Sequence, residues 1–159
     1  MELDHTKIVI RPARLDEWDT AMGLAWKTFL KFEASDYTTE GVRNFEDFVT
    51  DEMLKRMFVI GQYKLFCAFY KNHMVGMITL RDTAHISLLF VEEKYHRQGI
   101  GRKLIACVRN YLVNELGEKG MTVNASPYGV GFYHKVGFKD LRAEETKDGI
   151  TYTPMVVRF

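Results

Sequence analysis

The sequence predicts an α/β (α+β) fold, with a mixed, mostly antiparallel sheet of about seven strands and helices packed against it. Two observations predict this class. Helical apolar spacing dominates residues 17–58, and strand-like runs follow from residue 65 onward. A strand, a helix and another strand then occupy residues 85–125, and such a crossover joins parallel strands. Because the composition is uniform, we expect one domain spanning residues 1–159.

The first elements are a strand and three helices. The β-branched run over residues 7–11 predicts a short strand that ends at Pro12. Asp16 is a good N-cap for a helix over residues 17–32, because the apolar side chains that follow recur at helical spacing. Two further helices are expected, one starting at Thr38 or Thr39 and one over residues 53–58.

Strands dominate the second half of the chain. Residues 65–70 and 74–80 flank a short turn and predict an antiparallel hairpin. Residues 85–91 are apolar on both faces, as expected for a central strand. A continuous apolar stripe predicts a helix from Ile100 to the region of Gly117. The remaining elements are expected to be a strand over 121–125, a short helix over 130–136, and strands over 138–143 and 150–157.

Composition and charge disfavour several classes of function. The net charge of +1 gives no overall basic field for nucleic acid. The apolar runs are shorter than the roughly 18–20 residues of a membrane-spanning helix, so we expect no membrane partner. The amino-terminal residues lack the basic start and apolar core of a signal peptide. Cys67 and Cys107 have no CxxC spacing and are expected to be free thiols, which favours a cytoplasmic protein.

The most informative segment, residues 95–104, places two glycines between the central strand and the long helix. Gly99 and Gly101 let backbone N–H groups approach an anion without intervening Cβ atoms. The helix start adds unpaired N–H donors and a partial positive charge. This segment is therefore a candidate phosphate-binding loop, although a GxG pair also occurs in plain turns. Basic side chains surround it at Lys94, Arg97, Arg102 and Lys103.

Two common phosphate-binding motifs do not match this loop. A dinucleotide-binding fingerprint requires a third glycine three residues after Gly101, where Leu104 stands. The P-loop of nucleoside triphosphatases requires Gly-Lys followed by Ser or Thr, which residues 101–104 (GRKL) lack. Dinucleotides and nucleoside triphosphates are therefore disfavoured as ligands.

The loop instead resembles that of the GNAT superfamily of acyl-CoA-dependent N-acyltransferases. The family signature is Arg or Gln, two residues, Gly, one residue, and then Gly or Ala. Gly99 and Gly101 match this signature, whereas His96 stands at its opening position. Residues 131–138 (GFYHKVGF) resemble the family's closing pattern, an Asn on a strand followed by FYxKxGF. The resemblance extends over roughly residues 7–158 and implies the GNAT fold, in which the central parallel pair is splayed.

The resemblance also implies a binding site for acetyl-CoA as co-substrate. In the family, main-chain amides of the loop bind the CoA diphosphate, and the splayed strands offer backbone groups to the pantetheine arm. Lys135 and Arg102 are candidates for the 3′-phosphate, or else solvated surface charges. The cofactor-binding residues implied by the resemblance are Leu89, Phe90, Val91, His96, Arg97, Gln98, Gly99, Ile100, Gly101, Arg102, Asn124 and Tyr133.

Acetyl transfer to an amine needs a base for the ammonium proton, a donor for the carbonyl oxygen and an acid for the thiolate. The resemblance makes Tyr133 the candidate acid, because it matches the tyrosine of FYxKxGF. His85 is a candidate base that would act through ordered water, since related enzymes carry His or Glu at this strand position. Glu33, which follows the first helix, is its rival, and both residues have a plain reading as solvated side chains. The five histidines show no ligand spacing, so no metal site is expected.

The resemblance implies an N-acetyltransferase that moves an acetyl group from acetyl-CoA to a primary amine by direct attack in a ternary complex. The alternatives are an N-acyltransferase that uses a longer acyl-CoA or a peptide or protein amine, and a CoA-binding sensor without turnover. A small-molecule amine is the expected acceptor. Aromatic residues of the front half either line its pocket or fill the core. The final strand, which ends at Phe159, leaves a homodimer open as an alternative.

Overall fold

In the computed structural model, which describes residues 2–159, one sheet has the strand order β1-β2-β3-β4-β5-β8-β6, and β7 pairs with β8. Every pairing is antiparallel except that of β4 with β5, so the predicted fold class is confirmed. The strands are β1 (Ile8–Pro12), β2 (Lys64–Tyr70), β3 (His73–Arg81), β4 (His85–Val91), β5 (Gly120–Ala125), β6 (Lys139–Asp140), β7 (Glu145–Lys147) and β8 (Ile150–Arg158). The α-helices are α1 (Trp18–Phe32), α2 (Thr39–Val49), α3 (Glu52–Val59), α4 (Ile100–Leu116) and α5 (Val130–Lys135).

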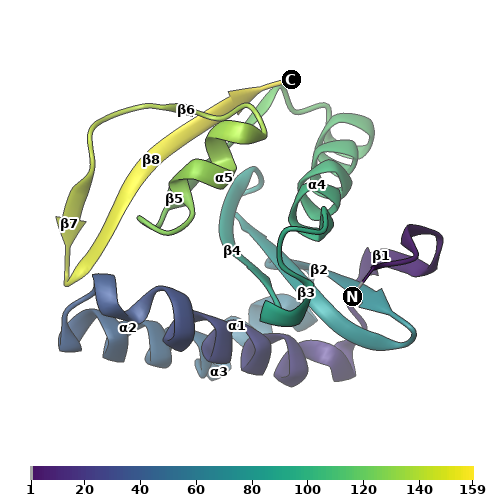
Figure 1. The fold of residues 1–159 in the computed structure, drawn as a ribbon, viewed down its shortest axis with the longest axis horizontal. Coiled ribbons are helices and arrows are strands. Elements are labelled where there is room, and N and C mark those ends of the chain that lie inside the picture. Colours follow the sequence, from purple (N-terminus) through teal and green to yellow (C-terminus); the bar gives the residue numbers. More distant parts are fainter. Residues whose placement is uncertain (1) are drawn as a thin grey trace.

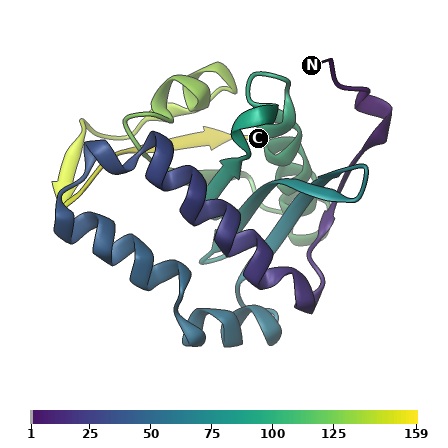
Figure 2. The ribbon, with the colours of Figure 1, turned by 60° about the horizontal axis from the view of Figure 1, so that its bottom comes forward.

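Two helical layers cover the two faces of the sheet. Helices α1, α2 and α3 lie on one side, and α4 with α5 lies on the other (Figure 1). Helices α1 and α2 run side by side across the first layer (Figure 2). Each layer encloses its own core, one around Phe29 and Met77 and the other around Leu104 and Ile78. Within residues 2–159, no helix has the length and apolar character needed to cross a membrane.

The helix starts follow from local capping. Thr38 Oγ1 accepts a hydrogen bond from the Gly41 N–H at 3.1 Å, which starts α2 where the sequence places it. The expectation that Asp16 caps the first helix is wrong, because Glu17 occupies the N-cap position. The Glu17 carboxylate accepts the Arg14 N–H at 2.6 Å and pairs with Arg11 at 2.8 Å. This pairing lowers the pKa of Glu17 to about 2 and fixes the entry to α1.

The predicted strand over residues 138–143 is wrong in extent, because β6 covers only Lys139–Asp140. The Leu141 N–H donates to the Pro154 carbonyl at 2.8 Å, but Pro154 has no N–H to return the bond. The ladder therefore stops there, and the chain pairs again with β8 only at Glu145–Lys147, as the separate strand β7. The sheet consequently has eight strands where about seven were expected.

Strand β4 is central and contributes to the cores on both faces of the sheet, as expected: Ile86 lies in the core around Leu104, and Leu88 and Phe90 lie in the core around Phe29. Strands β4 and β5 share only the pairs His85↔Thr122 and Ile86↔Val123, so they separate beyond these residues. On the edge of β4 that pairs with β3, Thr79 pairs with Leu88 and Leu80 pairs with Ile86. Ser87 is therefore the extra residue of a β-bulge in β4. The backbone of β4 beyond Ile86 therefore borders the opening between the separating strands.

Candidate active site

A cavity of about 1610 Å³ occupies the opening between β4 and β5 and extends toward α1 and α2. Gln98 is the one predicted site residue outside its lining, because its exposed Nε2 donates to the Lys94 carbonyl at 3.3 Å. The structure brings the other predicted site residues to one cavity: Glu33, His85, Leu89, Phe90, Val91, His96, Arg97, Gly99, Ile100, Gly101, Arg102, Asn124 and Tyr133.

The glycine loop opens this cavity at the start of α4. Gly99 is the N-cap residue and adopts φ 85°, a left-handed conformation that glycine reaches without strain. Arg97 is also left-handed, with φ 60°. The first intrahelical bond runs from the Lys103 N–H to the Gly99 carbonyl at 3.0 Å, so the amides just before Lys103 have no partner within the helix. This geometry suits an anionic ligand.

The departure of His96 from the family signature has a structural explanation. The His96 ring nitrogen Nε2 contacts the Val91 carbonyl oxygen at 2.5 Å and acts as the donor, because a carbonyl can only accept. The ring also packs against Phe32, with centroids 4.9 Å apart. His96 therefore holds the loop against the end of β4 and the last turn of α1.

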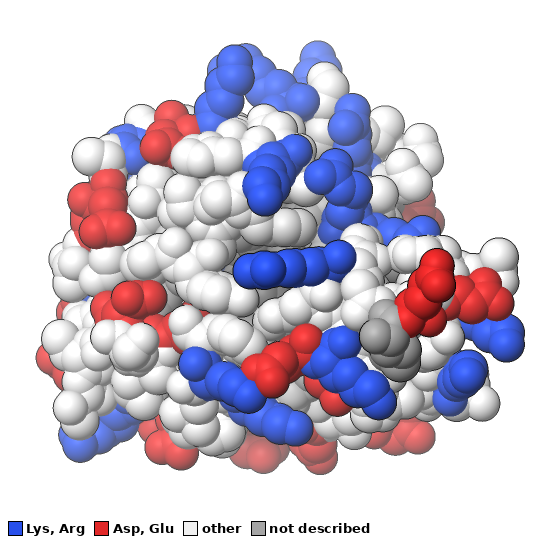
Figure 3. All heavy atoms as spheres, in the orientation of Figure 1, with Lys and Arg blue, Asp and Glu red and all other residues white. Residues whose placement is uncertain are grey.

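Gly101 serves a different purpose from Gly99. Its backbone is not in the left-handed region, and a Cβ here would stand 3.1 Å from the ring of Phe132. The missing side chain therefore lets α5 approach α4. Three cations, Arg97, Arg102 and Lys135, line the cavity near this loop. Figure 3 shows Lys and Arg side chains gathered on the upper part of this face, over α4, α5 and the end of β8.

Tyr133 lies on α5 and is 6% exposed, with its ring packed 5.2 Å from those of Phe132 and Phe138. No side-chain hydrogen bond among the described residues uses its hydroxyl, and none of their buried side-chain oxygens lacks a partner. The hydroxyl must therefore reach the cavity that Tyr133 lines. Burial and the charge of Glu33 raise the pKa of Tyr133, which keeps the hydroxyl protonated.

Glu33 closes the last turn of α1 and is half-buried in the same cavity. Burial raises its pKa to about 7, with Asp36 adding to the shift and a hydrogen bond with Ser126 opposing it. None of the ion pairs within residues 2–159 includes Glu33. The carboxyl also raises the pKa of Tyr37 and of Tyr133, so all three groups lie within electrostatic reach of one another.

His85 stands at the start of β4, where β4 and β5 are still paired. Its Nδ1 lies 2.7 Å from Thr122 Oγ1. Burial, with the nearby charge of Arg81, lowers the pKa of His85 to about 4, so the ring is neutral at neutral pH. A base with this pKa is matched less well to an ammonium group than the Glu33 carboxyl is.

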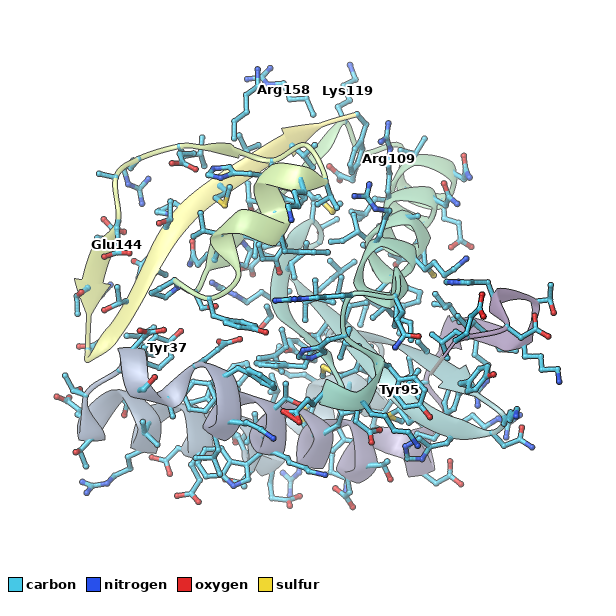
Figure 4. All side chains as sticks on the ribbon, in the orientation of Figure 1. Tyr37, Tyr95, Arg109, Lys119, Glu144 and Arg158 are labelled. Atoms are coloured by element: carbon cyan, nitrogen blue, oxygen red, sulfur yellow. The ribbon has the colours of Figure 1, made fainter. Side chains whose placement is uncertain are left out.

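The end of the cavity away from the glycine loop is lined by aromatic and polar side chains. Among the aromatic residues of the front half, Phe29 is fully buried in the core, whereas Tyr37 and Phe45 line the cavity. Tyr37 lies on the α2 side, below the lower end of β8 (Figure 4). Sequence reasoning missed Ser126 as a partner of Glu33, and its only signal was its place directly after the end of β5.

The described residues hold no group of three or more His, Cys, Asp or Glu side chains that could bind a metal ion. The cavity therefore combines an amide-lined loop, a cleft between separating strands, and a carboxyl and a tyrosine hydroxyl in one lining.

Several solved structures share the fold of this chain. No curated protein sequence matches the chain. A GCN5-related N-acetyltransferase from Rhodopseudomonas palustris is 21% identical, with a TM-score of 0.81 and 95% of each chain covered. The PaiA N-acetyltransferase from Thermoplasma acidophilum, solved with coenzyme A, is 20% identical, with a TM-score of 0.78, 96% of this chain and 99% of that chain covered. A variant of the spermidine N-acetyltransferase SpeG from Vibrio cholerae is 11% identical, with a TM-score of 0.68, 96% of this chain and 94% of that chain covered.

These distant structures alone do not assign the chain to a family, but a family model does. The model described as the acetyltransferase (GNAT) domain matches residues 33–159, which is most of the chain. Those residues include the glycine loop, both separating strands and Tyr133. The chain therefore belongs to the GNAT family and is an acetyltransferase.

Proposed function

We propose that the protein transfers the acetyl group of acetyl-CoA to a primary amine, by direct attack of the amine in a ternary complex. The amide-lined loop at Gly99 and the cations beside it suit the CoA diphosphate. The similar PaiA structure contains coenzyme A, and the SpeG structure is named for an amine substrate, spermidine. Both facts support this donor and this class of acceptor.

Glu33, the backbone of β4 and Tyr133 each contribute to a different part of the reaction. When bound, acetyl-CoA supplies a thioester carbonyl for attack and a thiolate leaving group. Glu33 takes a proton from the acceptor ammonium, so that the free amine can attack. The edge of β4 beyond Ile86 is not paired with β5, so its N–H groups are available to the carbonyl oxygen and the pantetheine arm. Tyr133 donates a hydrogen bond and then a proton to the departing sulfur. The second proton that the attacking nitrogen loses as the amide forms passes to the Tyr133 oxygen and restores the hydroxyl.

The protonation state of Glu33 affects the pKa of Tyr133 in the direction that the reaction needs. The negative charge of Glu33 contributes to the raised pKa of Tyr133. When Glu33 accepts the ammonium proton, this charge disappears and the pKa of Tyr133 falls. Tyr133 therefore becomes a better acid at the stage when the thiolate leaves. The raised pKa before that stage keeps the proton on Tyr133 while the substrates bind.

The observation that carries this proposal is the Glu33 carboxyl, which forms no ion pair with another described residue and has a pKa of about 7, in the same cavity as the Tyr133 hydroxyl. Purified protein should release free thiol from acetyl-CoA when primary amines are added, which a thiol reagent measures. Butyryl-CoA in the same assay tests the longer acyl donor. Tight CoA binding without thiol release for any amine would favour the sensor and reject the proposal.

Replacing Gly99 by Val is expected to weaken CoA binding at least about tenfold, because a β-branched residue is strained at φ 85° and the loop must change its conformation. Gly117→Val is the matched control. Gly117 ends the same helix at φ 66°, and a Cβ there meets nothing within 4 Å. Calorimetric titration with CoA should separate the two variants. Equal CoA affinity in both would contradict the placement of the diphosphate.

A further inference from the structure

The β-bulge at Ser87 is held by two hydroxyl groups that lie behind the strand. The Leu88 N–H donates to Thr79 Oγ1 at 3.0 Å, so a side chain of β3 accepts a backbone donor of β4 directly beside the bulge. The Tyr63 hydroxyl donates to Thr79 Oγ1 at 2.7 Å and to Ser87 Oγ at 3.0 Å. Tyr63 therefore connects the residues of β3 and β4 that border the bulge.

Tyr63 and Thr79 belong to the core and not to the cavity. Tyr63 is 1% exposed, Thr79 is fully buried, and neither lines the cavity. The Tyr63 ring packs against Trp18 of α1 and Phe48 of α2, with centroids 5.8 Å and 6.5 Å apart. Buried hydroxyls need hydrogen-bond partners, because leaving one without a partner is costly. Among the described residues, every side-chain hydrogen bond of these two hydroxyls leads to the other hydroxyl or to the bulge.

The bulge decides which groups of β4 face which layer. Without an extra residue, Ile86 and Leu88 would point to the same face of the sheet. Instead, Ile86 packs in the core around Leu104, and Leu88 packs in the core around Phe29. An extra residue in one strand therefore exchanges the faces of everything that follows it. The N–H groups that the proposed function assigns to the thioester carbonyl lie in this part of β4, beyond the last pairing with β5.

We propose that Thr79 and Tyr63 are positioning residues for acetyl transfer, which fix the bulge at Ser87 and thereby direct the following N–H groups of β4 at the thioester carbonyl; this rests on the proposed function. Thr79 holds the Leu88 N–H, and Tyr63 holds Ser87 against Thr79. The extra residue therefore stays at Ser87 and does not move along the strand. Neither side chain touches the substrates.

Thr79→Val tests this inference, with Thr79→Ser as the conservative variant. Valine keeps the branched shape of threonine but offers no oxygen to the Leu88 N–H, whereas serine keeps the oxygen. Thr79→Val should lower kcat, expressed per CoA-binding site, at least about 30-fold, because a donor to the carbonyl oxygen is displaced. The dissociation constant of CoA, measured by calorimetric titration, should stay within about threefold, since the loop at Gly99 is untouched. Thr79→Ser should restore most of kcat.

Thr153→Val is the matched control. Thr153 is a buried threonine of the same sheet, on β8, and lies outside the cavity lining. Its replacement should leave kcat within about twofold of the wild-type value. Amide hydrogen exchange reports the bulge itself, because the Leu88 amide should exchange faster in Thr79→Val than in Thr79→Ser.

Tyr63→Phe keeps the ring and removes only the hydroxyl, and it tests the same inference should Thr79→Val fold poorly. It should lower kcat at least about fivefold with CoA affinity nearly unchanged. Wild-type kcat in both Thr79→Val and Tyr63→Phe would overturn this inference and leave the proposed function standing. Equal loss of kcat in Thr79→Val and Thr79→Ser would also overturn it, as would a loss of CoA affinity that parallels the loss of kcat. A wild-type protein that releases no thiol with any amine would reject the proposed function, and this inference with it.

Discussion

Tyr133→Phe is expected to lower kcat for acetyl transfer by roughly 10²–10⁴-fold, because the departing thiolate loses its proton donor. The affinity for CoA should stay nearly unchanged, since the ring keeps its packing between Phe132 and Phe138. The fold should also tolerate the change, because the hydroxyl has no side-chain partner among the described residues to leave unpaired. Steady-state kinetics and calorimetric titration with CoA measure the two effects separately.

Tyr111→Phe is the matched control for this variant. Tyr111 lies on α4, packs 5.3 Å from the ring of Phe66, and is not part of the cavity lining. Removing its hydroxyl should leave kcat within about twofold of the wild-type value. If Tyr133→Phe retained full kcat, the tyrosine would be a packing residue only, and the leaving thiolate would need another proton source.

Most of the fold could be predicted from the sequence because its signals are local. The strand–helix–strand pattern around Ile100 fixed the parallel pair, and Thr38 marked the start of α2. The failures came from partners that lie outside the element being predicted. Glu17 replaces Asp16 as the N-cap because Arg11, on the neighbouring strand, holds its carboxylate. The early end of β6 depends on the missing N–H of Pro154 on another strand, which no local pattern records.

The site was predictable where it depends on the backbone and unpredictable where it depends on burial. Gly99 has the left-handed conformation that a glycine pattern indicates. Gly101 instead makes room for Phe132, a reason visible only when α4 and α5 are packed together. The choice between Glu33 and His85 as base could not be made from residue types. Their environments move the two pKa values in opposite directions, to about 7 for Glu33 and about 4 for His85.

Glu33→Gln is expected to lower kcat/KM by about 100-fold or more and to remove the acidic limb of the pH–rate profile. In the wild type this limb should have an apparent pKa of about 7, with the rate rising as pH rises, because Glu33 must be deprotonated to accept the ammonium proton. Glu40→Gln removes another carboxyl from the same cavity and should keep the limb. A limb that persisted in Glu33→Gln would assign the base to another group.

Glu33→Gln should also increase the free energy of unfolding, over a pH range set by the raised pKa of Glu33. Glu33 binds its proton more tightly in the folded state, with a pKa of about 7 against an ordinary value of 4.5, so the folded state loses stability as pH rises between these values. Glutamine carries no such penalty, and Glu33→Gln should therefore be more stable than the wild type by roughly 1–3 kcal/mol at about pH 8. Urea unfolding should show this advantage shrinking toward pH 4.5, where the wild-type carboxyl is protonated in the folded protein. A carboxyl whose removal stabilises the fold and lowers the rate of turnover is one that the structure retains for its chemistry.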